Sequence, residues 1–399
     1  MTSSFARNAL VLGLLSVVGP LAIDMYLPAL PSIAADLDAS TGATQMSLMA
    51  LLAAVAVGQV FYGPISDMVG RRPPLYFGLG VYAVGAIGCG LAPSIEALIA
   101  FRFVQGIGAC AGMTIPRAVV RDLHTGPDAA RLMSLVMLVF SVAPILAPLS
   151  GSALMTVASW RGLFFVIAAI GLMGLGLVAF ALPETRPPEK RIAASLGTVL
   201  SGYGRLLRDR HFMVMALIGG LGIAAFFAFI ASSSFVYIEH FGLTPTTFSL
   251  AFSINAVGFI GAAQFSAPLA RRFGFRPVVR AAVLGFAAMT TALLVVTLAG
   301  IDSLVLMMVL LFAGFGCLGL VVPSTAVLAL EDHGPIAGMA AALMGTLQMV
   351  AAAGAIGLTS LFFDGTSLSM VAAIATCSLL ALALSRVPDR RTARRHPAA

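Results

Sequence analysis

Charged residues are scarce in this chain of 399 residues. Asp, Glu, Lys and Arg together make up 10% of the chain, whereas about 25% is usual for a soluble domain. Hydrophobic residues make up 60%, and so few charges could not cover that much apolar surface in water. The composition excludes a soluble globular protein and predicts an all-α protein that crosses a membrane many times.

The sequence also lacks the patterns of enzyme and metal sites. Its five histidines fall in predicted loops or the tail, and no GxxxxGK[ST] loop for ATP occurs. Its four cysteines lie in apolar segments without metal-ligand spacing, and we interpret them as packing residues. We therefore expect no enzyme, no metal site and no cofactor. These residues are His124, His211, His240, His333 and His396, and Cys89, Cys110, Cys317 and Cys377.

Twelve apolar segments are long enough to cross a bilayer, which takes about 20 residues. The first follows Arg7 and resembles a signal peptide, but it is too long for one and eleven similar segments follow it. We predict membrane helices at 9–30, 44–65, 74–92, 96–118, 130–155, 162–182, 212–236, 247–270, 276–300, 303–328, 336–361 and 366–386.

The net charge of +7 could suggest nucleic acid binding, but its distribution over the predicted loops argues against that. Arg102 falls within a span and Arg161 in a loop on one side. The other 21 of the 23 Lys and Arg fall on the opposite side. Cytoplasmic loops carry such an excess, so we predict a multi-pass protein of the bacterial inner membrane with both termini in the cytoplasm. The basic tail could also contact anionic lipid.

The chain divides into two similar halves of six spans. We predict a bundle at 1–182, a cytoplasmic loop at 183–211, a second bundle at 212–386 and a basic tail at 387–399. "GPISDMVGRRP" from position 63 aligns with "APLARRFGFRP" from position 267, and "HTGP" from 124 aligns with "DHGP" from 332. The two offsets, 204 and 208 residues, are nearly equal, which indicates a duplicated unit. Two parallel repeats are typical of transporters whose substrate binds at the midplane between rocking halves.

Four stretches resemble one family. They are "DMYLPALPSIAADL" from position 24, "GPISDMVGRRP" from 63, "RFVQGIGACAG" from 102 and "APILAPLSG" from 143. Together they resemble the major facilitator superfamily, within it the twelve-helix drug:proton antiporters of the bicyclomycin and chloramphenicol resistance (Bcr/CflA) branch. The resemblance implies proton-coupled efflux of small apolar drugs by alternating access, and a monomer.

The sequence departs from that family at two positions. Met68 stands where a basic residue usually follows the aspartate of the loop signature, and Ser16 stands where some relatives carry a second acid in span one. These departures argue against export of strongly cationic drugs and against a two-proton stoichiometry.

Asp24 is the one acidic residue that falls deep within a predicted span. An intramembrane carboxylate costs several kcal/mol and indicates function by default. A proton carrier fits this position, and so does a structural acid that a neighbour satisfies.

Arg102 is a candidate partner for Asp24. Both lie about 9 Å below the same predicted boundary. Protonated Asp24 would release Arg102 and deprotonated Asp24 would engage it. Arg102 could instead join helices through backbone carbonyls. Gln105, which follows, could bind drug or a neighbouring helix.

A cytoplasmic gate is predicted where acids and arginines gather around the loop after span two. Ion pairs at such a place can form in one access state and break in the other. The resemblance implies that Asp67 lies near the start of span eleven and that Asp122 pairs with the arginines. The gate candidates are Gly63, Asp67, Gly70, Arg71, Arg72, Arg121 and Asp122.

In span five, Pro144, Pro148 and Gly151 remove two backbone donors and one side chain within two turns. An ordinary bend would explain them. Their spacing also matches the antiporter signature, which implies a seal against proton leak.

Apolar and aromatic walls with a few polar groups suit a drug-sized ligand. Candidate cavity residues, beside Gln105, are Tyr26, Met49, Met113, Phe226, Phe229, Asn255 and Gln348. For any single one, packing or lipid contact is the simpler interpretation.

The sequence as a whole predicts a proton-coupled drug exporter with a small-molecule drug, protons and the lipid bilayer as partners. A proton-coupled importer of a small metabolite on the same fold is the alternative, and the span-five signature disfavours it. A membrane-embedded enzyme or sensor on this scaffold is a further possibility that no residue pattern favours.

Overall fold

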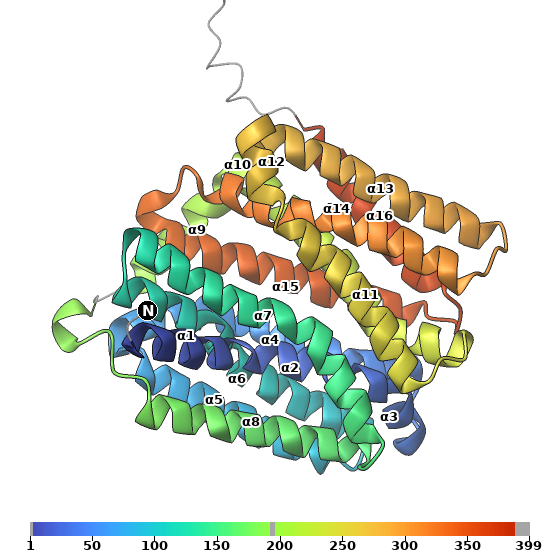
Figure 1. Cartoon of the computed structure of the whole chain (residues 1–399), viewed down its shortest axis with the longest axis horizontal. Coiled ribbons are helices and arrows are strands. Elements are labelled where there is room, and N and C mark those ends of the chain that lie inside the picture. Colours follow the sequence, from blue (N-terminus) through green and yellow to red (C-terminus); the bar gives the residue numbers. More distant parts are fainter. Residues whose placement is uncertain (1–2, 192–195, 388–399) are drawn as a thin grey trace, which may run out of the picture.

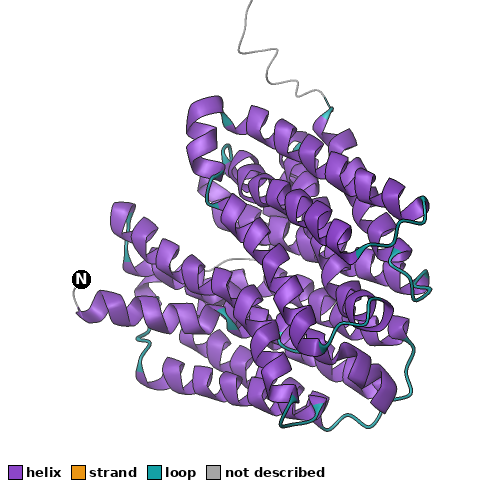
Figure 2. Ribbon diagram, turned by 45° about the vertical axis from the view of Figure 1, so that its right-hand side comes forward, coloured by secondary structure: helices purple, strands orange, loops and turns teal. Residues whose placement is uncertain are grey.

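The computed structural model describes residues 3–191 and 196–387, and this part of the chain is helical without a strand (Figure 2). The elements are α1 (Ser3–Ser16), α2 (Val18–Asp24), η1 (Leu27–Ala29), α3 (Leu30–Asp36), α4 (Thr41–Val69), α5 (Arg72–Gly90), α6 (Ile95–Leu123), α7 (Gly126–Met155), α8 (Trp160–Phe180), η2 (Pro188–Lys190), α9 (Leu196–Arg208), α10 (Arg210–Ser234), η3 (Phe235–His240), α11 (Pro245–Ala263), α12 (Ser266–Phe273), α13 (Phe275–Leu298), α14 (Leu304–Leu330), η4 (Gly334–Ile336), α15 (Ala337–Leu361) and α16 (Leu368–Ser385).

Within the described residues, twelve helices are long and apolar enough to cross a membrane, which confirms the predicted number. Their ends lie within a few residues of most predicted ends. The first span is longer than predicted, from Phe5 to Asp36, and the fourth continues to Leu123. Arg121 therefore lies in the last turn of a helix rather than in the following loop.

The first span is not one continuous helix. It is divided into α1, α2, the 3₁₀ turn η1 and α3. Pro28 has no N–H to donate to the carbonyl of Asp24, four residues earlier, so α2 ends at Asp24. Pro31 likewise cannot bond the carbonyl of Leu27. The two prolines thus place an interruption next to the one deeply buried carboxylate of the span.

The helices form two bundles, α1–α8 and α10–α16, the blue-to-green and yellow-to-red parts of Figure 1. The bundles meet where α4 packs against α15 and α7 packs against α11. We call the end where α1 begins and α8 ends the basic end, to the left in Figure 1. We call the other, where α3 ends and α8 begins, the distal end. There Asp36 accepts hydrogen bonds from Trp160 and Arg161.

The segment between the bundles was predicted as a loop but contains α9. Tyr203 and Leu206 of α9 are buried and pack with Phe212 of α10 and Leu343 of α15. The Tyr203 hydroxyl donates to the carbonyl of Val60 in the first bundle, at 3.4 Å. Apolar residues three apart on one face give α9 this attachment. The predicted tail, apart from Val387, lies outside the described residues.

The repeated loop motif has a backbone cause. Gly70 and Gly274, which the two aligned motifs match, have φ angles of 100° and 84°. Only glycine adopts such angles without strain. The same glycine ends α4 in the first bundle and α12 in the second, so the duplicated sequence corresponds to a duplicated turn.

Candidate transport site

Asp24 is buried, with 4% of its surface exposed, at the last residue of α2. In the described part of the chain no side chain forms an ion pair or a hydrogen bond with its carboxyl group. Burial opposes a negative charge there, and so do the carbonyl dipoles at a helix C-terminus. Asp24 is therefore a carboxyl group whose surroundings favour the neutral form.

Arg102 is fully buried between α2, α6 and α8. Its Nη1 donates to the carbonyl of Ala22 and to the Gln105 side chain, both at 2.8 Å. Its guanidinium carbon lies 4.1 Å from the centre of the Tyr26 ring. The contact with a backbone carbonyl, which the sequence left open as the alternative, is the one formed here.

The arrangement leaves Arg102 with unused donors. Its Nε and Nη2 are buried and have no hydrogen-bond partner among the described residues. The two residues that hold Arg102 on the first span, Ala22 and Tyr26, lie two positions before and two positions after Asp24. An unpaired cation and an unpaired carboxyl group thus occupy the same interrupted stretch without forming an ion pair.

The predicted cavity residues fall in separate groups. Tyr26 and Gln105 surround Arg102. Phe226, Phe229 and Asn255 are buried within the second bundle, where the phenylalanines pack against Phe252, Phe259 and Phe315.

The other three candidates make different contacts. Met49 lies against Gly357 between the bundles, Met113 packs against Gly19 of α2, and Gln348 approaches Gly219 of α10. Tyr26, Phe226 and Phe229 belong to one buried core that Met49 and Met113 pack against, and a shared drug cavity stays a prediction.

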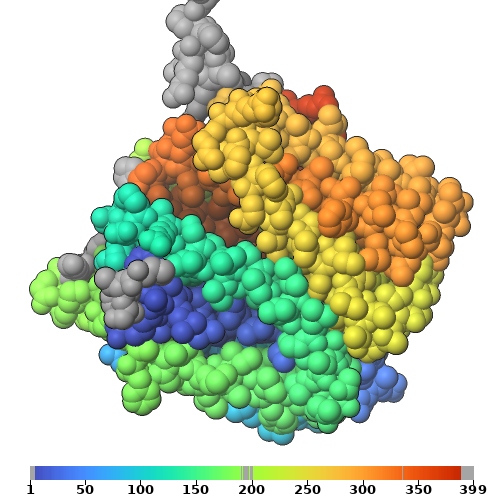
Figure 3. Space-filling view, in the orientation of Figure 1, coloured from blue at the N-terminus to red at the C-terminus, as the bar shows by residue number. Residues whose placement is uncertain are grey.

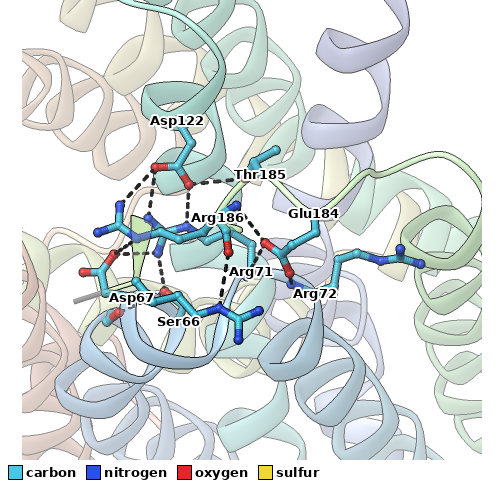
Figure 4. A network of polar contacts seen from close by, with 10 residues as sticks. Ser66, Asp67, Arg71, Arg72, Asp122, Glu184, Thr185 and Arg186 are labelled. Atoms are coloured by element: carbon cyan, nitrogen blue, oxygen red, sulfur yellow. Dashed lines mark hydrogen bonds and ion pairs between the residues drawn. The ribbon is translucent and has the colours of Figure 1, made fainter. Parts of the chain in front are cut away.

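At the basic end, Arg71 is the centre of a polar network (Figure 4). It is 3% exposed and donates to both carboxylate oxygens of Asp122, at 2.7 and 3.2 Å. Its Nη1 lies 2.9 Å from Asp67 and 2.7 Å from the Ser66 hydroxyl. A bidentate pair of this kind fixes geometry as well as charge.

The network differs from the predicted gate in its contacts with span eleven. Asp67 pairs with Arg71 and Arg186, both on the first bundle's side. The residue that approaches the start of α15 is Arg121, whose Nη1 lies 4.0 Å from a Cβ built on Gly338. Gly63 has open space around it, and Arg72 donates to Tyr76 and to the carbonyl of Ala179.

Sequence reasoning missed Glu184, Thr185 and Arg186, which follow α8. The Glu184 carboxylate accepts from the backbone N–H groups of Arg71 and Arg72 at the start of α5, at 2.8 and 3.1 Å. A helix N-terminus is a natural anion site. The sequence did contain a signal for this contact: three polar residues directly follow the sixth span, on the same side of the membrane as the loop motif.

Glu184 gives a prediction about pH. Burial raises the pKa of Glu184, but the N–H donors of Arg71, Arg186 and Arg72 lower it more, so it lies below the ordinary value of 4.5. Its stabilising effect is therefore complete above pH 4.5 and is lost as pH falls through the lower value of the folded state. We expect the Tm difference between wild type and Glu184→Gln to be constant from pH 8 to 5 and to shrink below pH 4.5. A difference that shrinks between pH 7 and 5 would contradict this.

The predicted antiporter motif of α7 lies at the contact between the bundles. The Ser249 hydroxyl of α11 donates to the Pro148 carbonyl, and the Ser253 hydroxyl donates to the Ile145 carbonyl, both at 2.9 Å. Gly151 faces the first span, where a Cβ on it would lie 1.9 Å from the Met25 carbonyl oxygen. The motif therefore joins α7 to α11 and to the interruption beside Asp24.

These serines give a second prediction. The double change of Ser249 and Ser253 to Ala should destabilise the contact between α7 and α11 by about 1 kcal/mol per hydrogen bond. Spin labels at the exposed residues Val157 and Leu250 should then report a larger population with these helices separated. Ser134→Ala is the control, because Ser134 bonds only within α7. Equal distance distributions in the double variant and wild type would refute the prediction.

The two bundles enclose a crevice that is open at one end. In Figure 3 the surface is hollowed between the basic-end part of α7 and α12, with α15 at the floor, whereas α7 and α11 touch toward the distal end. Gln45 of α4 and Ser232 of α10 also hydrogen-bond across the halves, at 3.3 Å. The conformation is therefore open at the basic end and closed at the distal end.

Two six-helix bundles around a crevice, with a buried carboxyl group at a broken helix, define a membrane transporter. The family model described as Major Facilitator Superfamily matches residues 12–357. The chain belongs to this superfamily, and it is a transporter rather than an enzyme.

The chain is also similar to individual transporters in sequence and in fold. The chain is 39% identical to an uncharacterised MFS-type transporter of Bacillus subtilis, over 86% of this chain and 85% of the relative. It is 32% identical to a bicyclomycin resistance protein homolog of Haemophilus influenzae, over 69% of each. It superposes on the xylose transporter of E. coli in a partially occluded inward-open conformation with a TM-score of 0.74, at 15% identity over 98% of this chain and 99% of that one. The resemblance to the drug:proton antiporter branch is confirmed.

Proposed function

We propose that this protein exports small, largely apolar drugs from a bacterial cell in exchange for protons, as a monomer in the inner membrane. The observation that carries the proposal is Asp24, a buried carboxyl group at the interruption of the first span that pairs with no side chain of the described residues. The similarity to a bicyclomycin resistance protein homolog supports the substrate class.

In the proposed cycle, the present conformation accepts drug at the basic end. We propose that this end faces the cytoplasm, and the excess of Lys and Arg in its loops supports that orientation. Asp24 is protonated, and Arg102 rests on Ala22 and Tyr26. Drug binding releases the proton, and the carboxylate then attracts the unused donors of Arg102.

The effect of deprotonation reaches the other bundle through η1. This turn begins three residues after Asp24 and packs against α10 and α11. A shift of η1 toward Arg102 would loosen the distal contacts that α11 makes with α7. Opening of the distal end to the periplasm would release the drug and admit a new proton to Asp24.

The network around Arg71 has the role of a gate in this proposal. Its ion pairs all lie on the first bundle and the segment after α8 while the basic end is open. Closure of the basic end would bring Asp67 and Arg121 toward the start of α15. Some ion pairs would then form in one access state and break in the other.

The test uses inside-out membrane vesicles with an acidic lumen. Chloramphenicol, bicyclomycin, a fluoroquinolone and a cationic dye are added one at a time, and vesicles without the protein are the control. The proposal expects a neutral compound to accumulate in the lumen and to dissipate the pH gradient. Accumulation without dissipation would contradict proton exchange, and movement out of the lumen would instead indicate an importer.

A further inference from the structure

Arg117 is a second arginine within the fourth span. The sequence placed it among the positive charges of the cytoplasmic side, but α6 continues to Leu123, so Arg117 lies about 9 Å inside the end of the helix. Its side chain is nevertheless exposed. An exposed arginine at this depth requires either lipid or a crevice beside it.

Its neighbours place Arg117 in the crevice. Arg121, four residues later and on the same face of α6, reaches toward Gly338 of α15 in the other bundle. Helical side chains point toward the N-terminus of their helix, which for α6 is the distal end. The guanidinium group accordingly lies 5.6 Å from the ring centre of Phe140 in α7 and within electrostatic range of Cys110, near the middle of α6.

No described carboxylate pairs with Arg117. Three acidic side chains at the basic end have other partners: Asp67 and Asp122 pair with Arg71 and Arg186, and Glu184 binds backbone N–H groups. Among the described side chains, the guanidinium group contacts the Phe140 ring and interacts electrostatically with Cys110, and neither of these is an acidic residue. The crevice therefore contains a cation that no acidic side chain of the described residues neutralises.

We infer that Arg117 determines the charge preference of the drug site: it favours drugs with a carboxylate or strong acceptor groups and disfavours cations. This inference rests on the proposed function and narrows its substrate class to neutral and anionic compounds. A unit charge a few ångströms from the guanidinium group, in a partly hydrated crevice, should change affinity by about tenfold. Arginine also presents a fork of donors that suits a carboxylate.

The test measures binding to the purified protein with three probes: neutral chloramphenicol, its anionic succinate ester and the cation tetraphenylphosphonium. Arg117→Gln removes the charge and Arg117→Lys retains it. We expect Arg117→Gln to weaken binding of the ester about tenfold and to strengthen binding of the phosphonium about tenfold. The affinity for chloramphenicol should stay within about twofold of the wild-type value. Arg117→Lys should bind the three probes in the same order of affinity as wild type.

Two results would overturn the inference. A parallel change for all three probes in Arg117→Gln would show a structural role, and equal charge preference in wild type and Arg117→Gln would show that Arg117 does not act on the drug. Binding to the purified protein is measured without a pH gradient. The effect of Arg117→Gln on charge preference can therefore be judged even if the protein does not exchange drug for protons. A wild-type protein that binds none of the probes would reject both the inference and the proposed drug site.

Discussion

Asp24→Asn is expected to reduce drug-driven proton movement to the level of vesicles that lack the protein. Asparagine keeps the size of the side chain and can hydrogen-bond, but it cannot release a proton. Because Asp24 has no ion pair with a described residue to lose, the variant should fold and bind drug with an affinity close to that of wild type. The measurement is the drug-induced collapse of the pH gradient in inside-out vesicles, with drug binding measured on the same preparation.

The matched control is Asp38→Asn. Asp38 belongs to the same region of the chain but is exposed beyond α3, and asparagine tolerates its positive φ of 46°. This control should move protons at the wild-type rate. If Asp24→Asn also collapses the gradient on addition of drug, then Asp24 is not the proton carrier and the proposed cycle is wrong.

Gly151→Ala is expected to have the largest effect on stability. A Cβ at this position would lie 1.9 Å from the carbonyl oxygen of Met25, an atom of the backbone that cannot rotate away. Either α7 or the interrupted first span must move, at a cost of at least about 2 kcal/mol. We expect a lower Tm and loss of transport, because the displaced segment carries Asp24.

Gly354→Ala is the matched control for Gly151→Ala. It also lies within a membrane helix, but its Cβ would meet nothing within 4 Å. Alanine is the better helix former, so this variant should be as stable as wild type or slightly more stable. Equal Tm values for the two variants would show that α7 does not pack closely against Met25.

The sequence predicted those parts of the fold that depend on hydropathy and on backbone restrictions. The twelve spans follow from the length of the apolar segments alone. The repeat was visible in the sequence because the same turn in each half requires a positive φ, and therefore a glycine, at Gly70 and at Gly274. The proximity of Arg71 and Asp122 follows from two short loops on one side of the membrane.

The parts that the sequence did not predict depend on side-chain direction and on contacts across long separations. Glu184 binds residues more than 100 positions earlier, and no local pattern encodes that choice. In the sequence Ser249 and Ser253 are ordinary small residues, because the carbonyl groups that accept their hydrogen bonds belong to α7, about 100 residues earlier. Phe226 and Phe229 were cavity candidates by residue type, but their stacking on Phe259 and Phe252 is a contact across long sequence separations that the sequence did not indicate.

Proton release on drug binding tests the central claim most directly. Purified protein in weakly buffered detergent solution is titrated with the transported drug, and a pH-indicator dye records the protons released. The account predicts that wild type releases a proton for each drug bound and that Asp24→Asn binds the drug and releases none. Equal release from both proteins, or none from wild type at saturating drug, would contradict the exchange of drug and proton through Asp24.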